Sequence, residues 1–159
     1  QARGVQPVLD FETAALAGLR PDGSTVARED LPRACDLIVV LGGDGTLIGT
    51  AGLVANAGVD IPIVGVNFGS LGFLTEVTLV ELYDAMSAVL DGTATVEARM
   101  MLECRVQQAD AEPHIRRAVL NDVVITRGSL SRMIDLEVRI DGGFVTRVKA
   151  DGLILASQS

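Results

Sequence analysis

Aromatic residues are scarce in this sequence, which has no Trp, one Tyr and four Phe among its 159 residues. A hydrophobic core must therefore be built mainly from Val, Leu, Ile and Ala. Histidine is also rare, and the single His114 lies in the polar stretch "ADAEPHIRR". We interpret this stretch as a connector and His114 as a surface residue, in preference to a metal ligand or a catalytic base.

Cysteines and long hydrophobic runs are few as well. Cys35 and Cys104 are isolated and lack the spacing of metal ligands, so we expect two buried free thiols in a cytoplasmic protein and no disulfide. The sequence has no run of about 18 apolar residues, which predicts that the chain does not span a membrane. Its first residues, "QARGVQPVLDFE", lack the apolar core of a signal peptide.

Basic residues are outnumbered, since 13 Lys and Arg stand against 21 Asp and Glu and give a formal net charge of −8. Nucleic-acid binding normally requires a field of Lys and Arg side chains that replaces counterions, so we expect no nucleic-acid partner. A local site can still bind a small anion against this charge. Hydrophobic residues make up 48% of the chain, which is typical of a folded domain and not of a disordered one.

The first half of the chain alternates apolar runs with helical patterns. The runs "DLIVVL", residues 36–41, and "IPIVGVN", residues 61–67, are typical of strands that are buried on both faces. Apolar residues at helical spacing follow the first run, over residues 46–56. Strand and helix in this alternation predict an α/β domain over residues 1–93, with a Rossmann-like parallel sheet covered by helices.

Four residues predict where the helices of this half begin and end. Gly58 is suited to end the helix predicted over residues 46–56. Thr78 and Glu81 have the spacing of a capping box, which predicts a second helix that starts at Thr78 and ends at Gly92.

After Gly92 the pattern changes to that of β structure. Residues 96–108 and 118–128 are predicted to be strands, and "DGG" at 141–143 is predicted to form a hairpin turn. Charged residues alternate with four apolar ones just before this turn: Ile134, Leu136, Val138 and Ile140. We therefore expect an antiparallel all-β domain over residues 94–159, with one face in water.

The stretch "GGDGT", residues 42–46, lies where the first predicted strand meets its helix. Ligands bind at the carboxyl ends of strands in open α/β sheets, and the amides of Thr46 and Leu47 are expected to face an anion there. The stretch matches neither a Walker loop nor a dinucleotide fingerprint. A tight turn without a ligand is the alternative. Asp44 would repel a bound phosphate unless it takes a proton or acts through a cation, so we favour phosphoryl transfer.

Three further stretches narrow the range of protein families that the sequence resembles. "NFGSLGFLTE" spans residues 67–76, "EARMML" spans 97–102 and "VLNDVVITRG" spans 119–128. The "GGDGT" stretch alone also marks phosphofructokinases and diacylglycerol kinases. The four stretches together, in this order, closely resemble the bacterial NAD kinases of the ATP-NAD kinase family.

The resemblance implies an enzyme that phosphorylates the 2′-hydroxyl of the adenosine ribose of NAD to give NADP. ATP with a divalent metal, expected to be Mg²⁺, is the usual donor in the family, and some members accept polyphosphate. By this resemblance Asp44 is the base that takes the proton of the ribose hydroxyl. We also expect a homodimer or homotetramer.

The resemblance further implies a set of residues that bind the dinucleotide. Phe73 matches an aromatic position near the adenine, with a place in the core as its alternative. Asn121 and Asp122 match a pair that holds the adenosine, and a turn between strands is their alternative. The full set of implied binding residues is Gly45, Phe73, Asn121, Asp122, Arg132, Lys149 and Asp151.

One departure from the family pattern lies at the end of the sequence. After "DGLI" the family continues through a Thr-Pro-Thr-Gly-Ser-Thr-Ala-Tyr segment, whereas this sequence reads "DGLILASQS". We therefore expect a partial kinase whose β domain is incomplete. Two alternatives stay open, namely a non-catalytic fragment that binds nucleotide or assembles with itself, and a lipid or sugar kinase of the "GGDGT" type.

Overall fold

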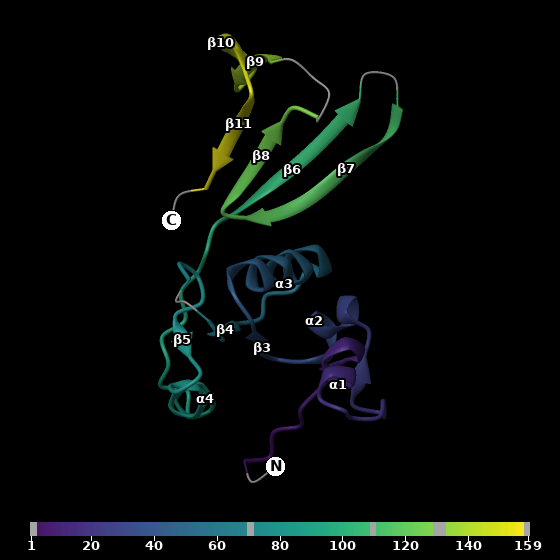
Figure 1. Cartoon of the computed structure of the whole chain (residues 1–159), viewed down its shortest axis with the longest axis vertical. Helices are drawn as coiled ribbons and strands as arrows, with labels where there is room; N and C mark the ends of the chain where they lie inside the picture. Colours follow the sequence, from purple (N-terminus) through teal and green to yellow (C-terminus); the bar gives the residue numbers. More distant parts are fainter. Residues whose placement is uncertain (1–2, 70–71, 109–110, 129–132, 158–159) are drawn as a thin grey trace. The chain divides into compact units, whose positions relative to one another are not determined.

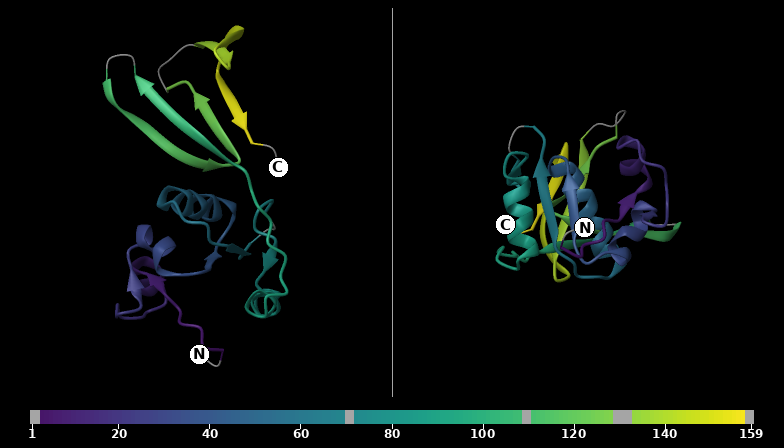
Figure 2. Two further views of the ribbon diagram at one scale, coloured as in Figure 1. Left: turned by 180° about the vertical axis from the view of Figure 1, so that it is seen from behind. Right: turned by 90° about the horizontal axis from the view of Figure 1, so that it is seen from below.

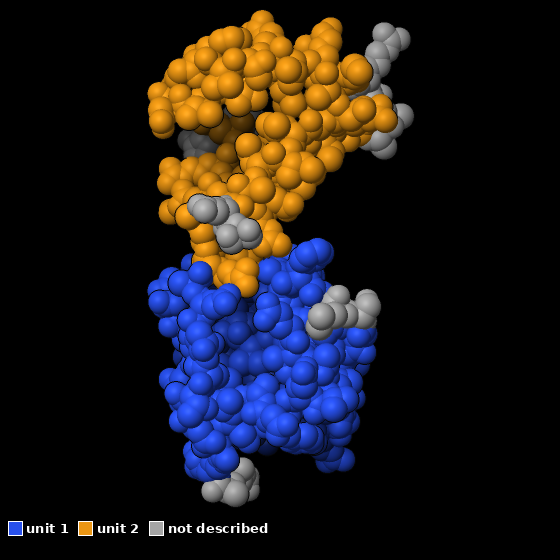
Figure 3. All heavy atoms as spheres, turned by 90° about the vertical axis from the view of Figure 1, so that its left-hand side faces the viewer, with its two compact units in different colours: residues 1–98 blue, residues 99–159 orange. Residues whose placement is uncertain are grey.

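The computed structural model describes residues 3–69, 72–108, 111–128 and 133–157. The chain divides into two compact units, residues 1–98 and residues 99–159, shown in two colours in Figure 3. The first unit contains helices and parallel strands, and the second contains antiparallel strands (Figures 1 and 2). This arrangement confirms the predicted fold class.

The first unit is built around a three-stranded parallel sheet in the order β3-β4-β5. Its strands are β3 (Ile38–Leu41), β4 (Ile63–Asn67) and β5 (Val77–Thr78). Helix α3 (Asp44–Ala57) connects β3 to β4, and α4 (Leu82–Leu90) follows β5. Before this sheet come β1 (Leu9–Asp10), α1 (Phe11–Leu16), β2 (Thr25–Val26), the 3₁₀ turn η1 (Arg28–Asp30) and α2 (Leu31–Ala34).

Strand β3 is covered on one face, and the prediction that it is buried on both faces is wrong. Gly65 is the register partner of Val40, and Leu47 of α3 lies where a side chain on Gly65 would project. Helix α3 therefore covers the face that carries Val40, which is buried. On the other face, Val39 and Leu41 are 37% and 49% exposed, because no described element packs over them closely enough to exclude water.

The predicted ends of two helices, at Gly58 and Gly92, are confirmed. Gly58 adopts φ 68° directly after α3, and Gly92 adopts φ 69° just after α4, so both use the left-handed conformation that favours glycine. The capping box forms in part. The Glu81 carboxylate accepts hydrogen bonds from the Thr78 amide at 3.0 Å and its hydroxyl at 2.7 Å. Helix α4 nevertheless begins at Leu82, so this pair closes the turn before the helix.

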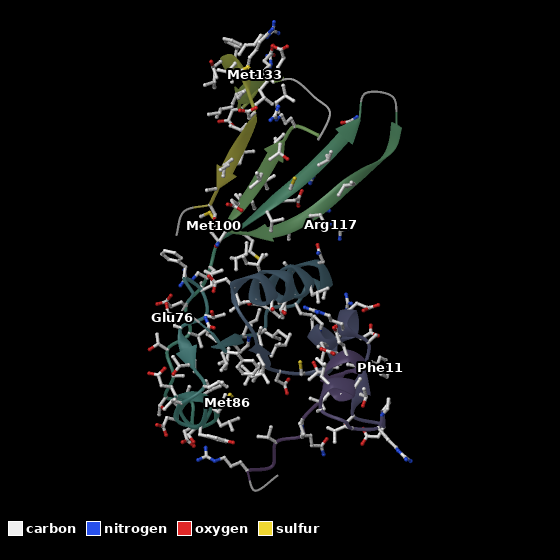
Figure 4. All side chains as sticks on the ribbon, in the orientation of Figure 1. Phe11, Glu76, Met86, Met100, Arg117 and Met133 are labelled. Carbon is white, nitrogen blue, oxygen red and sulfur yellow. The ribbon has the colours of Figure 1, made fainter. Side chains whose placement is uncertain are left out.

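The second unit consists of three antiparallel pairs (Figure 1). Strand β6 (Met101–Gln108) pairs with β7 (Ala111–Leu120), which carries Arg117 (labelled in Figure 4). The backbone of His114 lies in β7, so the prediction of a connector is wrong for residues 111–117, whereas residues 109–110 lie outside the described residues. The other pairs are β8 (Asp122–Thr126) with β11 (Gly152–Ala156), and β9 (Ile134–Ile140) with β10 (Gly143–Ala150).

The β9–β10 hairpin matches its sequence pattern. Asp141 and Gly142 adopt φ 50° and φ 80° between the strands, as expected of a two-residue turn in which both central residues are left-handed. Along β9, half-buried apolar residues alternate with exposed charged ones up to Val138. Ile140 breaks this alternation, because it is exposed beside the turn.

The two cysteines are free, but both are half-buried and not buried as predicted. Cys35 donates a hydrogen bond to the carbonyl oxygen of Leu31 at 3.0 Å. Partial burial raises the pKa of the Cys35 thiol above its usual value. Among the described residues, no helix is long and apolar enough to cross a membrane.

Candidate functional site

The glycine loop lies at the carboxyl end of β3, as predicted, but α3 begins two residues earlier than expected. Its first residue is Asp44, and the amides of Thr46 and Leu47 already donate to the carbonyl oxygen of Gly43, at 3.0 and 3.2 Å. The expectation that these two amides face an anion is therefore wrong. Gly42 is held by a hydrogen bond from its amide to Val66 O at 2.9 Å, which fixes the loop to the adjacent strand β4.

The Asp44 side chain is bonded to the segment that follows β4. Its Oδ2 atom accepts a hydrogen bond from the Phe73 amide at 2.8 Å. Its Oδ1 atom accepts three, from the Leu74 amide at 3.2 Å, the Thr75 amide at 3.0 Å and the Thr75 hydroxyl at 2.9 Å. Two segments about 30 residues apart in the sequence are thus joined by one carboxylate, which is half-buried.

Thr75 belongs to a further buried contact. Its side chain is 0% exposed and that of Asn67, at the end of β4, is 6% exposed. Asn67 Nδ2 donates to the Thr75 hydroxyl at 3.0 Å, and Asn67 Oδ1 accepts from the Gly69 amide at 2.8 Å. The carboxylate of Asp44 is therefore supported through Thr75 by a residue of the central strand.

Gly72 completes this cluster because only glycine fits at its position. A Cβ atom on Gly72 would lie 2.1 Å from Oδ1 and 2.6 Å from Cγ of Asp44. Such distances are far below van der Waals contact, so the backbone at Gly72 is pressed against the carboxylate. The close approach explains why the loop after β4 can offer three consecutive amides, from Phe73 to Thr75, to one side chain.

The surroundings of Asp44 favour its charged form. Burial by itself raises the pKa of Asp44, but the hydrogen bonds from Phe73, Thr75 and Leu74 outweigh this effect, so the pKa lies below the usual value of an aspartate. The group is therefore ionised at neutral pH and can accept a proton. Its Oδ2 atom accepts one hydrogen bond, which leaves this oxygen with capacity for another partner.

Gly45 and Phe73, the other predicted site residues of the first unit, are both exposed. The Phe73 side chain is 94% exposed, so the alternative that it belongs to the core is wrong. Gly45 lies in the first turn of α3, and a Cβ added there would meet no heavy atom within 4 Å. The backbone at Gly45 is therefore open to a ligand.

Asn121 and Asp122 lie between β7 and β8 in the second unit. Asn121 adopts φ 73°, and its carbonyl oxygen accepts hydrogen bonds from the amide of Ser157 at 2.7 Å and from the hydroxyl of Ser157 at 3.1 Å. The alternative of a turn between strands is thus correct for its backbone. Asp122 begins β8 and is exposed.

The remaining predicted binding residues also belong to the second unit. Lys149 on β10 lies 4.0 Å from Asp135 on β9, between Nζ and Oδ2. Asp151 Oδ1 lies 3.3 Å from Arg127 Nε, and both side chains are mostly exposed. These are exposed ion pairs, a class that contributes about 0–1 kcal/mol. Arg132 lies outside the described residues.

Sequence reasoning assigned no role to Asn67, Gly72 or Thr75, although all three lie in the stretch "NFGSLGFLTE". The charge of Asp44 is the signal that could have found them, because a partly buried carboxylate needs hydrogen-bond donors. Among the described residues, no group of three or more His, Cys, Asp or Glu side chains could hold a metal ion.

Comparison with known proteins relates the chain to one family. The family model described as "ATP-NAD kinase N-terminal domain" matches residues 6–94. The NAD kinase of Geotalea daltonii is 48% identical over 156 residues, which are 98% of this chain and 53% of that protein. The NAD kinase of Geobacter metallireducens is 52% identical over 157 residues, 99% of this chain and 53% of that protein.

Among solved structures, the crystal structure of yeast NADH kinase complexed with NADH matches with a TM-score of 0.82 and 29% identity, covering 94% of this chain and 48% of that chain. The chain spans about half the length of the curated relatives it matches.

Proposed function

This chain belongs to the NAD kinase family, and from this premise we propose that the protein transfers the γ-phosphoryl group of ATP to the 2′-hydroxyl of the adenosine ribose of NAD, giving NADP and ADP. The observation that carries the proposal is the ionised Asp44 carboxylate, held beside the glycine loop by hydrogen bonds from Phe73, Leu74 and Thr75. A fixed carboxylate at the carboxyl end of a parallel strand is suited to general-base catalysis.

In the proposed reaction, Asp44 takes the proton of the ribose 2′-hydroxyl. The hydroxyl oxygen forms a bond to the γ-phosphorus, and the bond from that phosphorus to the β,γ-bridging oxygen breaks. ADP leaves with the electron pair of the broken bond. The protein's own contribution is to hold the base in its charged form and at a fixed place, since positioning and electrostatic stabilisation account for most of the catalysis of phosphoryl transfer.

For NAD binding we propose the residues that match the family positions. The open backbone of Gly45 and the exposed ring of Phe73 belong to the first unit. In the second unit, Asn121 offers an amide, and Asp122 offers a carboxylate that accepts hydrogen bonds from ribose hydroxyls. Arg132, Lys149 and Asp151 complete the proposed set, and Lys149 and Asp151 would exchange their exposed ion pairs for contacts with the ligand.

Three broader features also belong to the proposal. Mg²⁺ would neutralise charge on the ATP phosphates, to which this ion commonly binds. The described residues offer no cluster of ligands for it, so we assign it no step on the protein. We further propose a cytoplasmic location, in keeping with the free thiols Cys35 and Cys104, and a homodimer or homotetramer.

The direct test replaces Asp44 by Asn in the protein expressed from its complete reading frame. NADP formation should fall by about 10²- to 10⁴-fold, the usual contribution of a general base, while calorimetry shows NAD binding of similar affinity. Asp60→Asn, at an exposed residue after α3, is the matched control and should leave turnover unchanged. Turnover that survives in Asp44→Asn would refute the assignment of the base.

Nucleotide binding without phosphoryl transfer is the second candidate for this chain taken alone, because it spans about half the length of its relatives. The same two measurements on the 159-residue chain separate the candidates. Heat of NAD binding without NADP formation supports the binding function, and NADP formation that depends on Asp44 excludes it. Phosphoryl transfer to diacylglycerol or fructose 6-phosphate alone would instead indicate a lipid or sugar kinase.

A further inference from the structure

We propose that Asn67 and Thr75 are positioning residues for Asp44. Asn67 directs the proton of the Thr75 hydroxyl toward Oδ1 of Asp44. Oδ2 is thereby left as the atom that accepts the substrate proton. The inference rests on the proposed function, because it names the atom that performs the proton transfer. It is carried by a chain of hydrogen bonds that links the end of β4 to the first residue of α3.

The first step is the orientation of the Asn67 amide. The Gly69 amide donates a hydrogen bond at 2.8 Å to the Asn67 side chain, so the atom at that position must be the oxygen. The nitrogen of Asn67 then faces Thr75, 3.0 Å from its hydroxyl oxygen. Because both side chains are buried, water does not compete for this contact.

The second step is the direction of the Thr75 hydroxyl. A hydroxyl has one proton to donate and two lone pairs that accept. Since Asn67 already donates to the Thr75 oxygen, the hydroxyl proton is directed to its other neighbour, Asp44 Oδ1, at 2.9 Å. An amide nitrogen cannot accept this proton, so the chain of donors runs in one direction, from Asn67 to Asp44.

The third step is the difference between the two oxygens of Asp44. Oδ1 accepts three hydrogen bonds, from the Leu74 amide and from the amide and hydroxyl of Thr75. Oδ2 accepts one, from the Phe73 amide. A carboxylate offers about two lone-pair sites on each oxygen, so the three donors more than fill Oδ1, whereas Oδ2 has one site left.

All of these donors are neutral, and this matters for a base. Among the described residues, the hydrogen bonds to Asp44 come from backbone amides and one hydroxyl, and no charged side chain pairs with it. A cation would neutralise the carboxylate and compete with the substrate proton. Neutral donors fix its position and keep its charge.

The test compares Thr75→Val with Thr75→Ser in the protein expressed from its complete reading frame. Valine keeps the shape of Thr75 and its amide but removes the hydroxyl, whereas serine retains the hydroxyl. In Thr75→Val we expect kcat to fall at least about 10-fold with little change in the KM for NAD. The acid limb of the kcat/KM profile should move to higher pH, because the lost donor had lowered the pKa of Asp44. Thr75→Ser should restore both properties.

Thr78→Val provides a matched control three residues away. Thr78 donates its amide and hydroxyl to the Glu81 carboxylate, just as Thr75 does to Asp44, but it is not bonded to the proposed base. This variant should leave both kcat and the pH profile unchanged. Equal changes in Thr75→Val and Thr78→Val would mean that the loss of any buried or half-buried threonine has this effect, and would overturn the proposal.

A measurement without turnover separates this inference from the proposed function. The titration of the Asp44 carboxyl carbon, followed by NMR, should shift to higher pH in Thr75→Val. It should shift further in Asn67→Asp, whose carboxylate would attract the Thr75 proton and add a negative charge. An unchanged titration in both variants overturns the inference. A wild-type protein that forms no NADP, yet shows these shifts, overturns the proposed function instead.

Discussion

At the scale of single residues, Gly72 is the position where the smallest substitution should do the most harm. A methyl group there would lie 2.1 Å from Asp44 Oδ1, so Gly72→Ala must displace either the carboxylate or the loop. We expect a loss of about 1–3 kcal/mol in the free energy of unfolding, as for other overpacked sites. NADP formation should fall with it, since the proposed base moves.

Urea unfolding and an assay of NADP formation check this expectation. Gly49→Ala is a suitable control, because Gly49 is exposed in α3 and its added Cβ would meet only Arg28 Nη2, at 4.0 Å. There alanine should leave activity unchanged and stabilise the helix by up to about 1 kcal/mol. If Gly72→Ala were as stable and active as the Gly49 variant, the close packing around Asp44 would be wrong.

The residues of the candidate site differ in how far the sequence reveals them. The glycine loop and the charge of Asp44 are local patterns, and both were predicted. The partners of Asp44 were not, because Phe73 and Thr75 are 29 and 31 residues away along the chain. Hydrogen bonds over such a separation depend on how β3 and β4 align, and spacing in the sequence does not encode that alignment.

At the scale of elements, Asn121 at the junction of β7 and β8 has a backbone role in the turn and a proposed side-chain role in binding, and two substitutions separate these roles. Its φ of 73° is adopted readily by glycine but costs alanine about 1–2 kcal/mol. Asn121→Ala should therefore destabilise the protein, whereas Asn121→Gly should retain its stability. If the amide also binds adenosine as proposed, both variants should lose NAD affinity, by roughly 2- to 13-fold for one hydrogen bond.

Unfolding in urea and NAD calorimetry on the two variants give independent answers. Full NAD affinity in Asn121→Gly would show that the residue serves the turn alone. Equal stability of the two variants would contradict the strained conformation at this junction.

The elements also show where the spacing of apolar residues predicts strands correctly and where it does not. The alternation along β9 and the "DG" turn are local, so the hairpin was predicted correctly. Residues 118–128 were predicted as one strand, but the left-handed conformation of Asn121 divides them into β7 and β8. The exposure of Val39 and Leu41 could not be predicted either, because an apolar run does not specify whether one face or two will be covered.

At the scale of the whole molecule, the segment between the two units should be an accessible cleavage site. Residues 95–100 form no helix or strand, and their side chains are exposed. Trypsin should therefore cut after Arg99 earlier than within the strands, because proteases favour exposed backbone outside secondary structure. Arg105 and Arg116 serve as internal controls, since they lie in the paired strands β6 and β7.

Mass spectrometry of a brief digest checks this order of cleavage. Early fragments 1–99 and 100–159 are the expected products. A first cut within β6 or β7 would contradict the division of the chain at this segment.

The two-part organisation was readable from the sequence, because the period of the apolar residues changes after Gly92. The position of the boundary differs from the prediction. The sequence pattern predicted it between residues 93 and 94, whereas the compact units meet between residues 98 and 99. The strand predicted over residues 96–108 begins only at Met101, so its first five residues were wrongly predicted, and no regular structure assigns residues 94–98 to one side.

The division into units also divides the charge of the chain. Residues 1–98 carry four Arg against 13 Asp and Glu, a net charge of −9, whereas residues 99–159 carry nine Arg and Lys against eight Asp and Glu, a net charge of +1. The unit that holds the proposed base therefore repels the phosphates of its own proposed substrates at long range. At an ionic strength of 0.1 M, dissolved salt screens this repulsion beyond a Debye length of about 10 Å. Cations bound to ATP reduce the repulsion further, because they neutralise part of the charge of the phosphates. Raising the ionic strength should therefore increase the rate at which nucleotide associates with this protein. The effect is opposite in proteins that attract their ligands by charge, where added salt lowers the association rate.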